Sequence, residues 1–493
     1  MSWSISVWKI PLCMLCSLLL SSLVLASTPV STRASGEVVG VWLTTADLST
    51  HLAPQPSLTF VNGSGSAATT ITVNENKVYQ EMDGFGASFT DSSAWLVYTK
   101  LNTSQRNTVM TNLFDANRGI GLDFLLQPMG ASDLTPPAPV AGEYSYDDVA
   151  QGQTDDPLNK FSIEHDKVYI IPVLKQALYV NRTLKIMAAP WSAPGWMKST
   201  GSMDGGTLNN SAYAAYANYF VKFIQAYKAQ GIPIYAVTPQ NEPLYVPNGY
   251  PGMSFLADQE TSFIKNNLGP AFVRHGINTK ILGYDHNWDR PDYPMTILQD
   301  KTANAYTAGT VWHCYGGTVD AQTQVHNSYP NKETYETECS GGRWEGNNGL
   351  PSTMNLLIGV VRNWGKSVLR WGMALDPNGQ PTLGTGAACS KCRGVVSIDQ
   401  NNGRVAYNAD YYGLGQASKF VVPGAYHIDS SAGDNGISDV AFKNPDGSKV
   451  LVVYNSSSGN QTFDVQWGRQ WFSYTLPAGA AATFKWSGSH LSG

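Results

Sequence analysis

The chain has 493 residues, of which 42% are hydrophobic and 14% charged, with 14 Trp and 25 Tyr. This composition argues against a disordered chain and is typical of a folded protein that binds an uncharged, ring-shaped ligand. The net charge of −5 and the lack of a Lys/Arg run argue against nucleic acid and anionic membrane surfaces as partners. The length suffices for one large core and a second, smaller domain.

The first 26 residues predict a secretory signal peptide. Lys9 is the only charge before an apolar stretch from Ile10 to Ala26, and that stretch ends in a compact Val-Leu-Ala cleavage sequence. The alternative is a membrane anchor, but the stretch is short for a span, contains Pro11 and lacks a charged stop flank. We therefore expect a secreted, extracellular protein with no integral membrane segment after cleavage.

The sequence pattern at the two ends of the mature chain predicts β-strands. After a Ser/Thr-rich lead-in at residues 27–36, short β-prone runs with Gly, Ser and Asn turns fill the segment up to residue 78: Val39–Leu43, Ser57–Val61 and Thr69–Val73. Apolar and polar residues also alternate near the C-terminus: Ser438–Phe442, Val450–Tyr454, Gln461–Trp467, Trp471–Leu476 and Ala480–Trp486. We expect residues 27–78 and 421–493 to form one β-sandwich.

The middle of the chain, residues 79–420, predicts a (β/α)8 barrel. The clearest helices are Ala212–Gln230, with a stripe of aromatic residues at helical spacing, and Met354–Trp364. Eight short apolar runs alternate with helix-like stretches, which favours a closed barrel over a doubly wound sheet. These runs are Met82–Phe89, Leu122–Met129, Leu184–Ala189, Ile234–Thr238, Lys280–Tyr284, Thr310–Tyr315, Glu333–Thr337 and Val368–Leu375.

Polar and aromatic residues follow these strands, at the barrel end where active sites lie. Glu242 follows the fourth strand and Glu338 the seventh, so the two carboxylates should face each other across the barrel mouth. Such a pair suits glycoside cleavage, in which one group protonates the departing oxygen and the other attacks or activates water. No Gly-rich phosphate loop and no convincing Ser-His-Asp grouping accompany them. We expect neither a cofactor nor a metal ion.

Further residues at the strand ends are candidates for contacts with a sugar. Asn241 precedes Glu242 and is placed to bond a hydroxyl next to the reacting carbon. Aromatic faces suit the C–H edges of sugar rings. His313 either faces the sugar or is a buried structural histidine, and the sequence does not favour one over the other. The complete set of predicted substrate-binding residues is Asp133, Trp191, Asn241, Tyr250, Asp285, His313, Tyr315, Trp344 and Trp371.

Four of the six cysteines lie outside the signal sequence, and an even number in an exported protein predicts two disulfides. Cys314 and Cys339 follow neighbouring strands at the same end of the barrel, so we expect them to pair; two free buried thiols are the alternative. Cys389 and Cys392 are expected to form the other bridge. Half of a zinc site is the competing interpretation, although no second close Cys/His pair is present.

Six ordered segments resemble glycoside hydrolase family 30, which includes glucosylceramidases and β-1,6-glucanases. They are Asp83–Asp91 (DGFGASFTD), Ala189–Lys198 (APWSAPGWMK), Thr238–Pro243 (TPQNEP), His313–Tyr315 (HCY), Thr337–Cys339 (TEC) and Ser418–Phe420 (SKF). The resemblance runs from about residue 79 to the C-terminus. It implies retention of anomeric configuration, with Glu242 as acid/base and Glu338 as nucleophile, and sugar contacts from Asp133, Trp191, Asn241 and Trp371.

One residue departs from the family pattern. Leu126 stands where the family carries an Arg near the nucleophile, and a missing cation is expected to raise the pKa of Glu338 or weaken turnover unless Gln127 or another residue compensates. The segments around Glu338, His313 and Cys389 are more similar to the β-1,6-glucanase branch. The resemblance therefore favours β-1,6-glucan as substrate over glucosylceramide or another β-glucoside. A carbohydrate-binding protein with impaired catalysis is the alternative from a different class.

Overall fold

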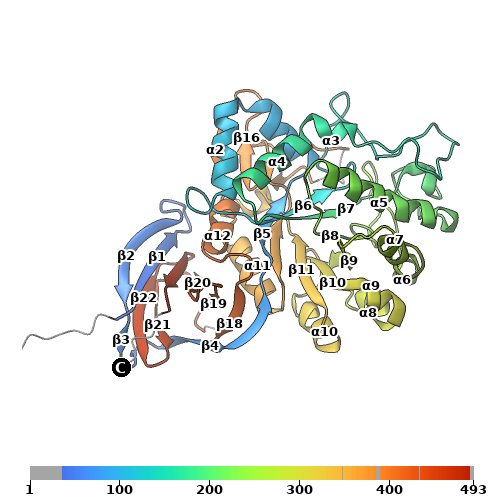
Figure 1. Ribbon diagram of the computed structural model, residues 1–493. Coiled ribbons are helices and arrows are strands. Elements are labelled where there is room, and N and C mark those ends of the chain that lie inside the picture. Colours follow the sequence, from blue (N-terminus) through green and yellow to red (C-terminus); the bar gives the residue numbers. More distant parts are fainter. Residues whose placement is uncertain (1–35, 347, 385–388, 432–433, 489–493) are drawn as a thin grey trace, which may run out of the picture. The chain divides into compact units, whose positions relative to one another are not determined.

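The computed structural model describes residues 36–488 with the exception of 347, 385–388 and 432–433. The predicted signal peptide lies outside the described residues. Eight parallel strands form a sheet in the order β11-β10-β9-β8-β7-β6-β5-β13, surrounded by helices (Figure 1). The strands are β5 (Gly84–Ser88), β6 (Phe124–Pro128), β7 (Lys185–Ala189), β8 (Ala236–Val237), β9 (Lys280–Asn287), β10 (Thr307–His313), β11 (Glu333–Glu338) and β13 (Ser367–Arg370).

Parallel bridges between Thr334 and Gly365 and between Ser340 and Trp371 close the sheet between β11 and β13. All eight predicted strands are therefore confirmed as a (β/α)8 barrel. The helices are α1 (Asp91–Trp95), α2 (Thr103–Phe114), α3 (Glu164–Val168), α4 (Ile170–Val180), α5 (Tyr213–Ala229), α6 (Ala257–Phe263), α7 (Gly269–Arg274), α8 (Asp292–Gln299), α9 (Lys301–Tyr306), α10 (Asp320–Ser328), α11 (Leu350–Arg362) and α12 (Ala409–Ser418). Both helices predicted from periodicity are present as α5 and α11.

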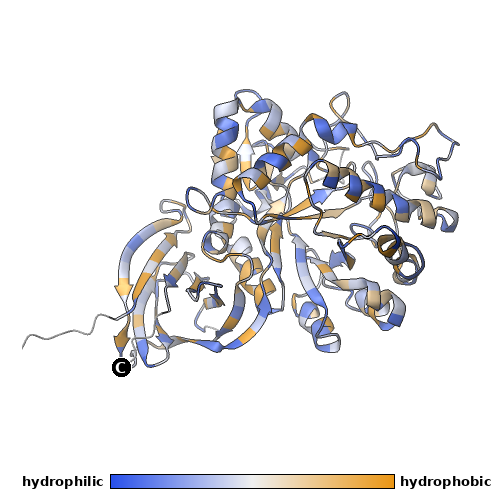
Figure 2. Cartoon of the chain, viewed as in Figure 1, coloured by the Kyte–Doolittle hydropathy of each residue, from blue (hydrophilic) through white to orange (hydrophobic). Residues whose placement is uncertain are grey.

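The β-rich ends join in one ten-stranded sheet, which confirms the predicted pairing of the two ends. Its order is β2-β1-β23-β20-β19-β18-β4-β21-β22-β3. Hydrophobic and hydrophilic residues alternate along its strands (Figure 2), and the apolar side chains form a core of their own. The strands are β1 (Val38–Thr44), β2 (Ala53–Thr59), β3 (Val61–Asn62), β4 (Thr69–Glu81), β18 (Tyr426–Ser430), β19 (Ile437–Lys443), β20 (Lys449–Asn455), β21 (Gln461–Trp467), β22 (Gln470–Leu476) and β23 (Ala481–Trp486).

The sandwich packs on the barrel through α11 and α12. Trp42 of β1 contacts Phe420 with ring centroids 4.5 Å apart, and apolar residues of both helices share a cluster with β19 and β20. The Arg362 guanidinium of α11 lies 2.9 Å from the buried Asp439 carboxylate of β19. These contacts hold the two β-rich chain ends against one side of the barrel.

Ion pairs close the amino-terminal end of the barrel. Lys185 Nζ lies 2.5 Å from Asp83 Oδ1, and Lys280 and Lys366 both contact the Glu333 carboxylate. Above this layer, apolar residues such as Leu126 fill the interior. Access to the barrel interior is therefore from the carboxyl ends of the strands.

Short strands shape that open end; apart from Ala374–Leu375, which lies in the predicted run Val368–Leu375, the sequence did not predict them. A two-stranded sheet joins β12 (Gly341–Gly342) to β15 (Cys392–Arg393), and a three-stranded sheet joins β14 (Ala374–Leu375), β16 (Val396–Ile398) and β17 (Val405–Tyr407). Among the described residues, no helix combines the length and apolarity needed to cross a membrane.

Candidate active site

A cavity of about 680 Å³ opens at the carboxyl ends of the barrel strands. Five of the predicted substrate-binding residues line it, together with both predicted catalytic glutamates. The lining residues from the prediction are Asp133, Tyr250, Tyr315, Trp344 and Trp371. Several lining residues were missed by the sequence reasoning: Tyr245, His286, Asn287, Ser340, Glu345, Ser352 and Arg370. In the sequence, Tyr245 and Asn287 come shortly after the predicted fourth and fifth strands. This position could have identified them as residues of the active-site end of the barrel.

The two predicted catalytic glutamates lie side by side at the bottom of this cavity. Glu338 is the last residue of β11, and Glu242 follows β8 in a loop. A carboxylate oxygen of each lies within 4.8 Å of the other. Glu242 has a φ of 47°, a strained conformation for a residue with a side chain, and its N–H donates to the Asp285 carbonyl at 2.9 Å.

His313, at the end of β10, links the glutamates to a fourth buried group. Its Nδ1 lies 3.2 Å from Glu242 Oε1 and 3.9 Å from Glu338 Oε1. Its Nε2 lies 3.1 Å from Asp285 Oδ1. Because both ring nitrogens face carboxylates, the arrangement favours the doubly protonated imidazolium.

Asp285 lies beneath the glutamates and does not line the cavity. Its carboxylate accepts hydrogen bonds from Thr238 Oγ1 at 2.6 Å and from Thr337 Oγ1 at 3.0 Å. With His313 as third partner, its oxygens are committed to the protein. The expected direct sugar contact from Asp285 is therefore not supported by the geometry; the positive φ values of Tyr284 and Asp285 (81° and 79°) turn this part of β9 away from regular strand geometry.

The charges of this cluster set its proton affinities. Burial opposes a charge on His313, but Glu338, Asp285 and Glu242 outweigh burial and raise its pKa well above the ordinary value. Burial alone would raise the pKa of Glu242, whereas the hydrogen bond and charge of His313 hold it below its ordinary value. Burial, only partly offset by His313, and the neighbouring Glu242 charge raise the pKa of Glu338. The glutamate pair therefore binds one proton over a wide pH range.

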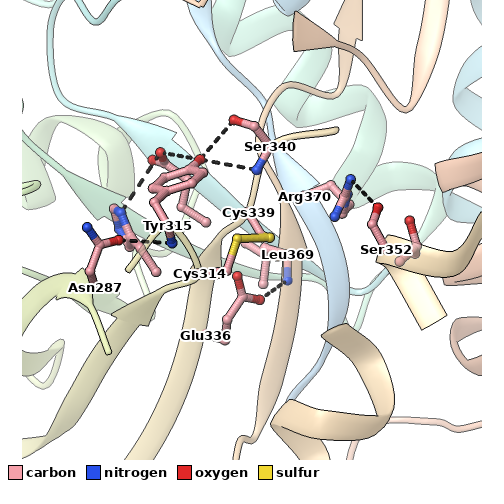
Figure 3. Close-up of a disulfide and its surroundings, with 12 residues drawn as sticks. Asn287, Cys314, Tyr315, Glu336, Cys339, Ser340, Ser352, Leu369 and Arg370 are labelled. Carbon is pink, nitrogen blue, oxygen red and sulfur yellow. Dashed lines mark hydrogen bonds and ion pairs between the residues drawn. A yellow bond between two sulfur atoms is a disulfide. The ribbon is translucent and has the colours of Figure 1, made fainter. Parts of the chain in front are cut away.

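Tyr315 and a disulfide adjoin Glu338. Figure 3 shows Tyr315 beside Ser340 and near the disulfide between Cys314 and Cys339. The Tyr315 hydroxyl lies 2.9 Å from Glu338 Oε1 and accepts a hydrogen bond from Ser340 N at 3.1 Å. Cys314 and Cys339 form the predicted disulfide, with Cα atoms 5.3 Å apart. Because the two cysteines adjoin Tyr315 and Glu338 in the chain, the bridge links the backbone segments that carry both side chains.

The predicted sugar-binding residues on the other side of the cavity form an aromatic and acidic wall. Trp191 stacks on Trp371 with centroids 5.0 Å apart, and only Trp371 lines the cavity. Asn241 is buried, and its Oδ1 has no hydrogen-bond partner among the described residues. Burial raises the pKa of Asp133 to about 6, although the N–H groups of Cys389 and Leu134 partly offset this effect.

The second disulfide, between Cys389 and Cys392, is also present and borders this wall. Cys389 N lies 3.4 Å from Asp133 Oδ2. Because the two thiols are joined to each other, the competing zinc interpretation of this pair does not apply to the structure.

Leu126, the departure from the family pattern, is fully buried in the apolar interior of the barrel. Gln127 does not replace the missing Arg, because its amide donates to the neighbouring Pro128 carbonyl. His313 is the cationic side chain beside both glutamates instead.

Glu242, His313 and Glu338 also lie close enough together to be considered as metal ligands. A metal ion requires a neutral histidine with a free lone pair on one ring nitrogen. Here both nitrogens of His313 bond carboxylates and its pKa is raised. The charge state of the cluster therefore fits a proton-transfer site better than a metal site.

Two adjacent glutamates at the carboxyl end of a (β/α)8 barrel, one buried and one partly buried, line a cavity with aromatic walls and define a glycoside hydrolase type of site. The chain belongs to glycosyl hydrolase family 30: residues 82–421 match the TIM-barrel domain of that family, and residues 424–484 match its β-sandwich domain.

Two relatives and a solved structure illustrate the similarity. The chain is 36% identical to an endo-1,6-β-D-glucanase of Neurospora crassa over 80% of this chain and 82% of the relative. It is 32% identical to the putative glucosylceramidase 4 of Caenorhabditis elegans over 80% of this chain and 78% of the relative. The solved structure of an endo-β1,6-glucanase is 33% identical in sequence to this chain and superposes with a TM-score of 0.82. The match covers 92% of this chain and 100% of that chain.

Proposed function

We propose that the protein hydrolyses β-1,6-glucan with retention of anomeric configuration. The observation that carries the retaining mechanism is the spacing of the two glutamates. Retaining glycosidases place their carboxyl groups about 5–5.5 Å apart, whereas inverting enzymes need about 6.5–9.5 Å to admit a water molecule. Oxygens of Glu242 and Glu338 within 4.8 Å of each other favour the retaining arrangement.

In the proposed mechanism Glu338 is the nucleophile and Glu242 the acid/base. A Glu338 oxygen bonds to the anomeric carbon while the glycosidic C–O bond breaks and the Glu242 proton passes to the departing oxygen. Glu242 then removes a proton from water, whose oxygen attacks the same carbon and releases Glu338. Two inversions at one carbon give net retention.

The pKa directions imply that substrate binding rearranges the shared proton. In the free site, the raised pKa of Glu338 and the lowered pKa of Glu242 favour the proton on Glu338. Catalysis requires it on Glu242. A sugar hydroxyl that donates to Glu338 favours the ionised form of that carboxylate, so the bound substrate moves the pair toward its reactive state.

The sugar at the reaction centre is proposed to contact Asp133, Asn241 and Trp371. The buried amide oxygen of Asn241 has no hydrogen-bond partner in the part of the chain that the structure describes. Trp371 presents an aromatic face that stacks on Trp191. Such a surface suits the C–H edges of a pyranose ring. Tyr250, Tyr315 and Trp344 line the rest of the cavity and are proposed to bind further sugar rings.

The choice of β-1,6-glucan rests on the relatives. Among those described above, the Neurospora crassa glucanase is more similar in sequence than the nematode glucosylceramidase, at 36% against 32% identity. We also propose that the protein is secreted. Lys9 and the apolar stretch after it support export, and the disulfides of the barrel are stable in an oxidising compartment.

A substrate panel tests this proposal directly. We expect the secreted protein to release reducing ends from pustulan, a β-1,6-glucan, faster than from laminarin or glucosylceramide, with an aryl β-glucoside as a general reporter. NMR of the first products should show the β-anomer. Hydrolysis of glucosylceramide without action on pustulan would show that the proposed substrate is wrong and that glucosylceramide is the substrate. A first-formed α-anomer would contradict retention. Sugar binding without turnover would support the impaired binding protein.

A further inference from the structure

The cavity is bounded on one side by a short loop that carries an exposed aromatic ring. After β11 the chain forms β12 and a 3-10 turn, Arg343–Glu345. Trp344 on this turn is 55% exposed and lines the cavity. An exposed indole on a loop would normally lose much conformational freedom when a ligand binds to it.

Beneath this loop lies a cluster of four charged side chains that the proposed reaction does not use. Asp410 of α12 bonds Arg370 at 2.8 Å and Arg393 at 2.8 Å. Arg393 also bonds Glu345 at 2.7 Å, and Arg370 lies 3.8 Å from Glu345. The four groups are largely buried and their two positive and two negative charges balance.

The cluster holds the loop backbone as well as its side chains. Glu345 Oε2 accepts a hydrogen bond from Gly342 N at 3.1 Å, and Arg393 Nη1 donates to Gly342 O at 3.2 Å. Gly342 also pairs with Cys392 in the small sheet. The loop is therefore fixed to α12, to the end of β13 and to the segment of the Cys389–Cys392 disulfide.

Glycines make these close approaches possible. A Cβ atom on Gly341 would lie 2.5 Å from Arg370 Nη2 and 2.7 Å from Asp410 Oδ1. On Gly342 it would lie 2.1 Å from the Trp344 ring, so the indole rests directly on the backbone of Gly342. The glycine backbone against the ring, and the ion cluster that fixes the loop, restrict the positions open to Trp344.

We propose that the ion cluster of Glu345, Asp410, Arg370 and Arg393 positions Trp344 as a fixed wall of the cleft and thereby sets affinity for substrates longer than one sugar. This inference rests on the proposed action on a glucan chain. A ring that is already ordered loses little entropy on binding, so preorganisation appears in KM for long substrates. Asp410 and Arg393 act through Trp344 and are positioning residues.

The test compares Trp344→Ala, Asp410→Asn and the double variant on β-1,6-gluco-oligosaccharides and on an aryl β-glucoside. We expect Trp344→Ala to raise KM for oligosaccharides about five- to tenfold, the effect of about 1–1.4 kcal/mol of aromatic contact. Asp410→Asn should raise it in the same direction, and the double variant should be no worse than Trp344→Ala alone. Asp439→Asn, which removes a buried Arg-paired carboxylate in the sandwich, is the matched control. It should lower Tm without changing KM.

Hydrogen exchange supplies a readout that does not depend on the substrate. Backbone amides of residues 341–345 should exchange faster in Asp410→Asn and not in Asp439→Asn. If Asp410→Asn does not fold, Glu345→Gln replaces it with the same expectation. Unchanged exchange and KM in a folded variant, or additive effects in the double variant, would overturn the proposal. Absence of pustulan cleavage by the wild type would refute the proposed substrate alone, and the comparison would use the polymer that the panel identifies.

Discussion

The two disulfides differ mainly in the loops they close, which allows a quantitative prediction. Cys314–Cys339 spans 25 residues and Cys389–Cys392 spans 3. In the chain-entropy model, closing these loops in the unfolded chain contributes about 3.5 and about 1.6 kcal/mol. Double Cys→Ser variants of each pair change the same atoms. We therefore expect the free energy of unfolding to fall by about 2 kcal/mol more for the first variant than for the second.

Denaturant unfolding of the two variants beside the wild type measures this difference, after peptide mapping of the non-reduced wild type shows both bridges. Activity should separate them in another way. Loss of Cys314–Cys339 should lower kcat, because the bridge adjoins Glu338 and Tyr315, whereas loss of Cys389–Cys392 should act on KM through Asp133. Equal losses of stability, or a larger loss for the short loop, would refute the entropy reasoning. Alkylation of Cys314 and Cys339 without reduction would remove the bridge itself.

Three further predictions concern the glutamates and their neighbours. Glu338→Gln should abolish turnover and retain sugar binding, and a 2-fluoro glycoside should label Glu338; a label on another carboxylate would reassign the nucleophile. Glu242→Ala should slow substrates with poor leaving groups far more than activated aryl glycosides and yield a β-glycosyl azide when azide is added, whereas an α-product would contradict the acid/base role. Asp285→Asn removes the anion 3.1 Å from His313, which lowers the raised pKa of His313. The alkaline limb of the pH profile of kcat/KM should therefore move to lower pH. If that limb does not move and only kcat falls, Asp285 has a packing role and does not set the pKa of His313.

The barrel could be predicted from the sequence because its strands are short apolar runs that end at polar residues. The sandwich was predicted less completely. β18 was missed, since Tyr426–Ser430 contains His and Asp and lacks a clear apolar alternation, and β4 runs to Glu81 through exposed polar residues that hide its second half. Strands with one solvated face and charged residues carry a weak pattern, and their pairing partners decide their length.

The site was predictable where a residue lies at or shortly after the carboxyl end of a strand, as Glu338 and Glu242 do. It was not predictable where local backbone geometry or distant partners decide the outcome. Asp285 has a positive φ and its carboxylate bonds His313, which contacts Glu242; no periodicity indicates this placement. The cluster under Trp344 joins Glu345, Arg370, Arg393 and Asp410 from separate segments, and only the folded chain brings those charges together.

The replacement of the expected Arg by Leu126 changes where positive charge enters the site. An Arg on β6 would place a positive charge near Glu338, the proposed nucleophile, whereas Leu126 belongs to the apolar interior. The available cation is His313, and its Nδ1 lies nearer to Glu242 than to Glu338, at 3.2 Å against 3.9 Å. Burial raises the pKa of both glutamates, but the hydrogen bond and charge of His313, with the His286 charge, lower the pKa of Glu242, whereas the charges of Glu242 and Asp133 add to the raised pKa of Glu338. The pKa of Glu338 is raised, the direction expected without the Arg, and its causes are burial and the charges of Glu242 and Asp133.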